Sequence, residues 1–171
     1  DYVVGLPESM GGSGDTSPLT GLGVYLGMKA CAKSVWNSDN LEGRTVAMQG
    51  FGKVGKFTAK HLISEGVNLV VTDINENALA EARSMGAKTT TLEEIYDAEC
   101  DIFSPCALGG VLNSNTIPRL NCAIVAGGAN NQLLENKNGE ELAKAGILYA
   151  PDYVINAGGI INASCELDGV Y

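Results

Sequence analysis

The 171-residue sequence has few of the side chains on which several kinds of active site and scaffold depend. It has one histidine, His61, one tryptophan and three phenylalanines, and its five cysteines include no C-x-x-C pair. Neither a zinc site nor a disulfide scaffold is therefore expected, and no metal site is predicted. We expect the cysteines to be buried, reduced thiols of a cytoplasmic protein. His61 lies inside a predicted helix and is interpreted as a packing or surface residue.

Basic residues and long apolar runs are also scarce. Eleven Lys and Arg residues face twenty Asp and Glu residues, which gives a net charge of −9. Such a surface repels phosphate backbones and anionic membranes, so no nucleic acid or membrane partner is expected. No stretch approaches the roughly 18 apolar residues of a membrane span, and the start of the chain does not resemble a signal peptide. Because the first residue is not Met, we expect a fragment or a processed product.

The length of the chain suits one domain over residues 1–171. Along it, short apolar runs alternate with segments of helical pattern. A helix is predicted over about 16–36, and its glycines imply a close neighbour. Further helices are predicted after Gly55 to about Glu65 and over 75–85, 92–96 and 139–144. Strands are predicted over 45–49, 68–72, 101–104, 123–126 and 147–150. Their continuous apolar character indicates burial on both faces. The fold class is therefore α/β, a Rossmann-type doubly wound, mainly parallel sheet with helices on both faces.

A G-x-G-x-x-G motif, Gly50-x-Gly52-x-x-Gly55, follows the first predicted strand and opens a helix. In a glycine-rich chain the motif alone is weak evidence, but its context is that of a dinucleotide-binding turn. The first glycine makes the turn, the second lets a pyrophosphate approach the backbone, and the third lets helix and strand pack closely. Free N–H groups at the helix start would bind the anion.

Asp73 ends the next predicted strand, 23 residues after Gly50. Its carboxylate is placed to accept hydrogen bonds from an adenosine ribose diol, and it would repel a 2′-phosphate, so NAD is favoured over NADP. Asp73 could equally cap the helix that begins near Asn75. Both roles are compatible with each other.

Three loops rich in small residues and asparagine follow later apolar runs, at 105–110, 127–131 and 156–159. Ligands bind at such loops in open α/β sheets, although each loop alone could be only a turn. No nucleophile elbow, acid pair or catalytic base is visible, so no catalytic residue is predicted in this chain.

Four segments, Gly11–Thr20, Gly50–Gly55, Cys106–Gly110 and above all Ala150–Gly159, resemble the glutamate, leucine, phenylalanine and valine dehydrogenase superfamily, closest to its leucine dehydrogenase branch. The resemblance covers essentially the whole chain and implies the NAD-binding domain of an L-amino-acid dehydrogenase. It further implies reversible oxidative deamination to a 2-oxo acid and ammonia, with hydride transfer to NAD. The substrate lysines and the proton-moving aspartate of the family belong to a catalytic domain that we expect to be absent here. The fragment alone is therefore expected to be inactive, and the full-length enzyme to be a homo-oligomer.

The resemblance also implies roles for individual residues. Asn156 would lie near both nicotinamide and substrate, and Lys53 would either aid phosphate binding or point to solvent. The expected cofactor-binding residues are Thr20, Gly50, Phe51, Gly52, Lys53, Val54, Asp73, Cys106, Ala107, Leu108, Ala129, Asn130 and Asn156.

Two alternatives remain. A stand-alone NAD-sensing module would bind the dinucleotide without chemistry, but it has no need of an amide at the reactive end, where Asn156 is expected. A Rossmann-type domain serving proline or tetrahydrofolate chemistry would keep the glycine turn without the Ala150–Gly159 string.

Overall fold

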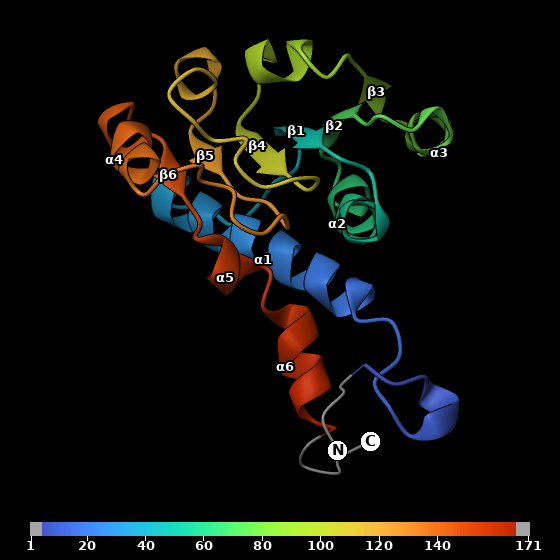
Figure 1. Ribbon diagram of the computed structural model, residues 1–171. Coiled ribbons are helices and arrows are strands. Elements are labelled where there is room, and N and C mark those ends of the chain that lie inside the picture. The colour runs from blue at the N-terminus through green and yellow to red at the C-terminus, as the bar shows by residue number, and fades with distance from the viewer. Residues whose placement is uncertain (1–4, 167–171) are drawn as a thin grey trace.

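A six-stranded, all-parallel sheet forms the centre of the computed structural model, which describes residues 5–166 (Figure 1). The strand order is β3-β2-β1-β4-β5-β6, so the order reverses between β1 and β4. The strands are β1 Thr45–Gln49, β2 Asn68–Thr72, β3 Lys88–Thr89, β4 Ile102–Pro105, β5 Ile124–Val125 and β6 Leu148–Tyr149. This is the strand order of the Rossmann fold, which confirms the predicted class.

The strands are mostly buried on both faces, as their continuous apolar runs predict. All of β1 after Thr45 is buried, and so is all of β4. The predictions for β5 and β6 were too long, because only two residues of each run pair with a neighbour. The sequence prediction missed β3, whose two residues, Lys88 and Thr89, are polar and flank no apolar run.

Helices connect the strands on both sides of the sheet. They are α1 Ser17–Trp36, α2 Lys53–Ser64, α3 Glu76–Ser84, α4 Lys137–Lys144, α5 Asp152–Ile155 and α6 Gly158–Ser164, with 3₁₀ turns at Glu8–Met10, Glu94–Asp97 and Ile117–Arg119. The helix predicted over 92–96 is thus only a 3₁₀ turn. The segment 156–159, predicted as a loop directly after a strand, instead joins α5 to α6, because Gly158 already begins a helix.

Helix α1 runs across the sheet-bearing body, with α5 and α6 beside it (Figure 1). Its glycines are sites of close packing, as expected. A Cβ atom at Gly21 would lie 2.6 Å from Phe57 Cβ on α2, and one at Gly27 would lie 2.4 Å from the Ile155 side chain on α5. Larger residues at these positions would push the helices apart.

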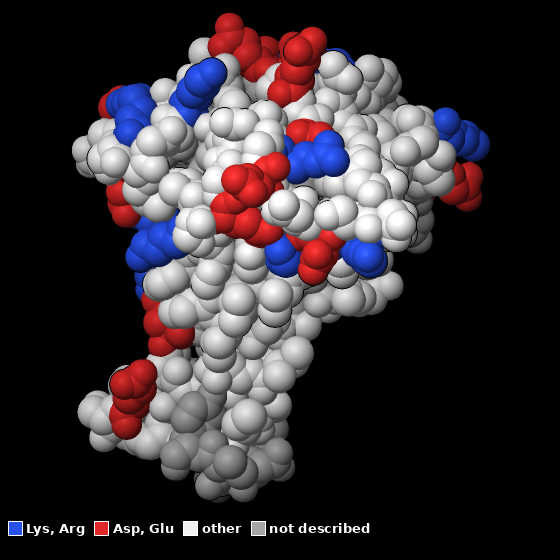
Figure 2. All heavy atoms as spheres, turned by 180° about the vertical axis from the view of Figure 1, so that it is seen from behind, with Lys and Arg blue, Asp and Glu red and all other residues white. Residues whose placement is uncertain are grey.

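Two apolar layers cover the sheet. On one face α1, α2 and α3 contribute Val24, Met28, Leu62 and Ala82 to one cluster. On the other face the 3₁₀ turns and α4 contribute Ile95, Ile117 and Leu142 to a second. Figure 2 shows many charged side chains on the broad part of the molecule at the top of the view and few on the narrower part at the bottom.

Glu65, just after α2, joins three parts of the chain. Its carboxylate accepts hydrogen bonds from the Tyr25 hydroxyl at 2.6 Å, Lys29 Nζ at 2.7 Å and the Leu41 amide at 3.0 Å. Partial burial opposes ionisation, but these donors outweigh it and hold the pKa of Glu65 below its usual value. The ionised carboxylate therefore stabilises the packing of α1 against α2.

Replacing Glu65 with glutamine is expected to lower the free energy of unfolding by about 1–2 kcal/mol at neutral pH, because charge-assisted hydrogen bonds are lost. Since the folded-state pKa is depressed, the stabilisation is present above the unfolded value of 4.5 and is lost as the pH falls through the folded value. Urea unfolding between pH 3 and 7, at roughly unit steps, measures this difference. Glu81→Gln, which breaks the more exposed pair with Lys56, is the control and should cost less than about 0.5 kcal/mol. Equal stability of wild type and Glu65→Gln at neutral pH would contradict the prediction.

Candidate functional site

The candidate site lies at the carboxyl edge of the sheet, where β1, β2 and β4 end together. Gln49 pairs with Thr72 on one side and with Pro105 on the other. The next residue of each strand, Gly50, Asp73 or Cys106, therefore emerges at the same edge. This is the point where the strand order reverses, and ligands of open α/β sheets bind there.

The three glycines of the motif occupy different environments. Gly50 has a φ of +99°, and a Cβ atom there would lie 2.8 Å from the amide nitrogen of Ala107. A Cβ at Gly55 would lie 2.6 Å from the Gly50 carbonyl oxygen, so α2 packs directly on the turn. A Cβ at Gly52 would meet nothing within 4 Å. The exposed backbone at Gly52 is therefore the part of the turn that a ligand can approach.

The amino end of α2 presents unpaired backbone donors. No side chain caps the helix at Gly52. Within residues 5–166, the Gly52, Lys53 and Val54 amides have no acceptor. Such amides, together with the positive end of the helix dipole, bind anions such as phosphate.

The ring and the amide of Phe51, which was expected to bind the cofactor, are both engaged within the protein. Its ring is fully buried, and its amide donates to Asp73 Oδ2 at 2.6 Å. The Gly50 amide is also engaged, by the Thr72 carbonyl at 2.8 Å. Both residues thus fix the shape of the turn.

Asp73 holds the turn with one oxygen and its own loop with the other. Oδ2 accepts from Phe51, and Oδ1 accepts from the Asn75 amide at 2.8 Å. The helix-cap interpretation of Asp73 was wrong, because Asn75 is the N-cap of α3 and its side chain accepts from Asn77. An ionised carboxylate has about four acceptor positions, so two remain for ligand hydroxyls.

A cavity of about 440 Å³ lies beside the turn. It brings together four of the residues expected to bind the cofactor: Thr20, Val54, Asn130 and Asn156. Its other lining residues are Thr16, Gly128, Tyr153, Ala157, Gly159 and Ile160. The lining contains no Lys, His, Asp or Glu, so this described part of the site offers no carboxylate, imidazole or amine for proton transfer.

The two asparagines of the cavity are joined. Asn156 Nδ2 donates to Asn130 Oδ1 at 2.6 Å and lies 3.4 Å from the Gly128 carbonyl oxygen. The side-chain nitrogen of Asn130, Nδ2, and the side-chain oxygen of Asn156, Oδ1, therefore remain available to a ligand. Ala129 is almost fully buried, its amide donates to the Pro105 carbonyl at 2.9 Å and its carbonyl accepts from Gln132, so its backbone groups hold the loop in place.

Gln132 holds the loop 127–131 in place through its side chain, a role that the sequence analysis did not predict. The side chain is fully buried, and its Nε2 donates to the Gly127 carbonyl at 2.7 Å and the Ala129 carbonyl at 2.9 Å. These two carbonyls flank Gly128, which contacts Asn156. Gln132 thus fixes the loop that carries Asn130.

Loop 106–108 lies across the turn. Ala107 contacts Gly50, and Leu108 is 76% exposed. Cys106 Sγ lies 3.5 Å from the Gly128 amide and joins the loops after β4 and β5. Burial raises the pKa of the Cys106 thiol, which is therefore a packing group at neutral pH.

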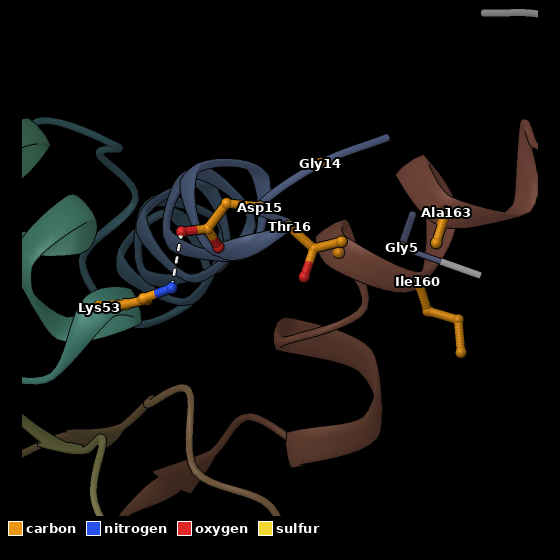
Figure 3. A pocket seen from close by; sticks show the side chains of 8 residues that line it. Gly5, Gly14, Asp15, Thr16, Lys53, Ile160 and Ala163 are labelled. Carbon is orange, nitrogen blue, oxygen red and sulfur yellow. Dashed lines mark ion pairs between the residues drawn. The ribbon is translucent and has the colours of Figure 1, made fainter. Parts of the chain in front are cut away.

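A second cavity, also of about 440 Å³, lies on the other side of Thr16 (Figure 3). Lys53 Nζ contacts Asp15 Oδ2 there at 3.1 Å across the ends of α2 and α1. Hydrogen bonds from Ser17, with a further contribution from Lys53, lower the pKa of Asp15 to about 2. Lys53 is thus an exposed side chain with an acidic partner.

Within residues 5–166, no three His, Cys, Asp or Glu side chains are grouped so that they could hold a metal ion. Over the same residues, no helix is both long and apolar enough to cross a bilayer.

The fold and the glycine turn define a Rossmann-type α/β protein. The family model for glutamate/leucine/phenylalanine/valine dehydrogenase matches residues 11–78 and 71–169, and the chain belongs to this family.

Individual relatives agree with this assignment. The chain is 54% identical to leucine dehydrogenase of Thermoactinomyces intermedius over 98% of its own length and 46% of that protein. It is 48% identical to phenylalanine dehydrogenase of Bacillus thermotolerans, again over 98% of its length and 46% of the relative. The crystal structure of L-tryptophan dehydrogenase from Nostoc punctiforme superposes with a TM-score of 0.88 at 50% identity, over 91% of this chain and 47% of that one. The chain thus spans about half the length of these relatives.

Proposed function

We propose that this chain is the NAD-binding domain of an L-amino-acid dehydrogenase similar to leucine dehydrogenase. The observation that carries the proposal is the row of unpaired amides at Gly52, Lys53 and Val54, placed next to the half-buried carboxylate of Asp73. A pyrophosphate needs such amides, and the neighbouring ribose needs such a carboxylate. The open space above Gly52 supports the fit.

The cavity with Asn130 and Asn156 would take the nicotinamide end of the cofactor. When bound, NAD would accept the hydride from the α-carbon of the amino acid, and water would then convert the imino acid to the 2-oxo acid and ammonia. In this proposal Asn130 and Asn156 orient the ring and the adjacent substrate through amide hydrogen bonds. Proton transfer by a carboxylate, an imidazole or an amine would fall to groups outside the described cavity, whose lining has none of these.

The names of the relatives support this reaction class, since they are leucine, phenylalanine and tryptophan dehydrogenases. We propose that the amino acid binds between this chain and a second, catalytic domain, and that the complete enzyme is an oligomer. One related structure is described as a hetero-hexameric glutamate dehydrogenase from Thermus thermophilus.

The proposal is tested by calorimetric titration with NAD and NADP. NAD should bind at least about tenfold more tightly, a difference of about 1.4 kcal/mol, because Asp73 repels the 2′-phosphate. Asp73→Ala should remove most of this preference, by weakening NAD binding and relieving the repulsion. Asp73→Asn keeps an acceptor for the Phe51 amide and should narrow the preference with less disturbance of the turn. Equal affinity of the unaltered chain for both cofactors would refute the role of Asp73, and no binding of either would refute the proposed function.

A further inference from the structure

Cys100 and Cys122 are neighbours at the end of the sheet opposite the candidate site. Cys100 precedes β4, and Cys122 precedes β5. Glu99 pairs with Asn121 in a parallel bridge, and the Cys100 amide donates to the Asn121 carbonyl at 3.2 Å. Ile102 then pairs with Ile124. Both pairings have the same offset of 22 residues, so Cys100 lies in register with Cys122.

The two side chains point to the same side of the sheet. Both pack against the apolar cluster that contains Phe103 and Val125, and their thiols interact with each other. Adjacent strands are about 4.8 Å apart, which lies inside the range of Cα separations found in disulfides. Both cysteines keep part of their surface exposed to solvent.

The other three cysteines have no such partner among the described residues. Cys31 lies in α1, Cys106 contacts Ser104 and Gly128 at the carboxyl edge, and Cys165 contacts the Ile161 carbonyl of its own helix. Only Cys100 and Cys122 combine register, a shared face and access to solvent in this part of the chain.

We propose that Cys100 and Cys122 form a reversible disulfide when the protein meets a peroxide. Cys122 is the reacting thiol: its thiolate attacks one peroxide oxygen, the O–O bond breaks, and the second oxygen leaves as hydroxide, which takes up a proton to give water. The Cys100 sulfur then attacks the sulfenic acid, the S–OH bond breaks, and a second water leaves with the remaining thiol proton. In total, two thiols and one hydrogen peroxide give one disulfide and two waters.

The surroundings support this division of roles. The Cys100 thiol, together with the Phe103 and Ile124 amides, holds the pKa of Cys122 below its usual value, although burial opposes this. The same pairing and burial raise the pKa of Cys100. The thiolate is the form that attacks peroxide, so Cys122 reacts first and Cys100 resolves.

The test is differential alkylation of the whole chain. The reduced protein is treated with hydrogen peroxide, freed of peroxide, unfolded in urea with iodoacetamide present so that buried free thiols are also blocked, and digested with trypsin without reduction. We expect two of the five thiols to escape alkylation and peptide Thr89–Arg119 to be linked to Leu120–Lys137, with the link removed by dithiothreitol. Five alkylated thiols, or a link between two chains, would overturn the proposal.

Two variants assign the linked residues, since Cys106 lies in the same peptide as Cys100. Cys106→Ser should keep the link. Cys100→Ser should abolish it and leave Cys122 as a sulfenic acid that dimedone labels. A link that survives Cys100→Ser would overturn the assignment. The result does not depend on cofactor binding, so the proposal stands apart from the proposed function.

Discussion

Replacing Gly50 with alanine is expected to lower the free energy of unfolding by about 2–5 kcal/mol. The left-handed backbone at Gly50, with a φ of +99°, costs about 1–2 kcal/mol for a residue with a side chain. The new Cβ would also lie 2.8 Å from the Ala107 backbone, and overpacking of this kind costs about 1–3 kcal/mol more. Denaturant unfolding of the variant measures the sum. A loss below about 1 kcal/mol would show that loop 106–108 adjusts freely.

Gly52→Ala is the matched control, two residues away in the same turn. Its φ of −75° suits alanine, and its Cβ would meet no atom within 4 Å. Stability should therefore change by less than about 0.5 kcal/mol. NAD affinity, however, should fall about tenfold, because the methyl group would occupy the approach of the pyrophosphate. Unchanged NAD affinity in Gly52→Ala would place the diphosphate elsewhere.

The sequence predicted the parts of the fold that depend on local pattern. The runs at 45–49 and 68–72 match β1 and β2 residue for residue, because four consecutive apolar or β-branched positions in each, bounded by turn residues, leave little choice of structure. It failed where pairing with distant residues decides the structure. Strand β3 is defined by parallel pairing of Lys88 and Thr89 with Val70 and Val71 of β2, and no local pattern at residues 88–89 indicates it.

The site shows the same division. The glycine motif and Asp73 were predictable from the sequence because Gly50 directly follows the run that forms β1 and Asp73 directly follows the run that forms β2. The bond from the Phe51 amide to Asp73 was not visible, because it joins two turns that only the folded sheet brings together. Gln132 was missed for a similar reason. A single glutamine in a polar segment has no periodic signal, and its burial depends on the loops that surround it.

Gln132→Met is expected to lower the free energy of unfolding by about 2–4 kcal/mol, since the Gly127 and Ala129 carbonyls each lose a buried donor. Methionine has a similar length, so little of the loss would come from a cavity. The loop after β5 would also become less ordered. Because Asn130 and Asn156 line the cavity proposed for nicotinamide, NAD affinity should fall by about tenfold, measured by calorimetry well below the unfolding temperature.

ADP-ribose separates positioning from general damage, because it carries the pyrophosphate and both riboses but no nicotinamide. Its affinity for Gln132→Met should stay within about twofold of wild type. Asn138→Leu provides the matched control, since Asn138 is another buried amide and lies on α4 with partners Ser114 and Glu141. It should lose stability while leaving the ratio of NAD to ADP-ribose affinity unchanged. If Gln132→Met weakens both ligands equally, Gln132 supports only the fold; if it weakens NAD alone, the buried amide sets the geometry of the nicotinamide end.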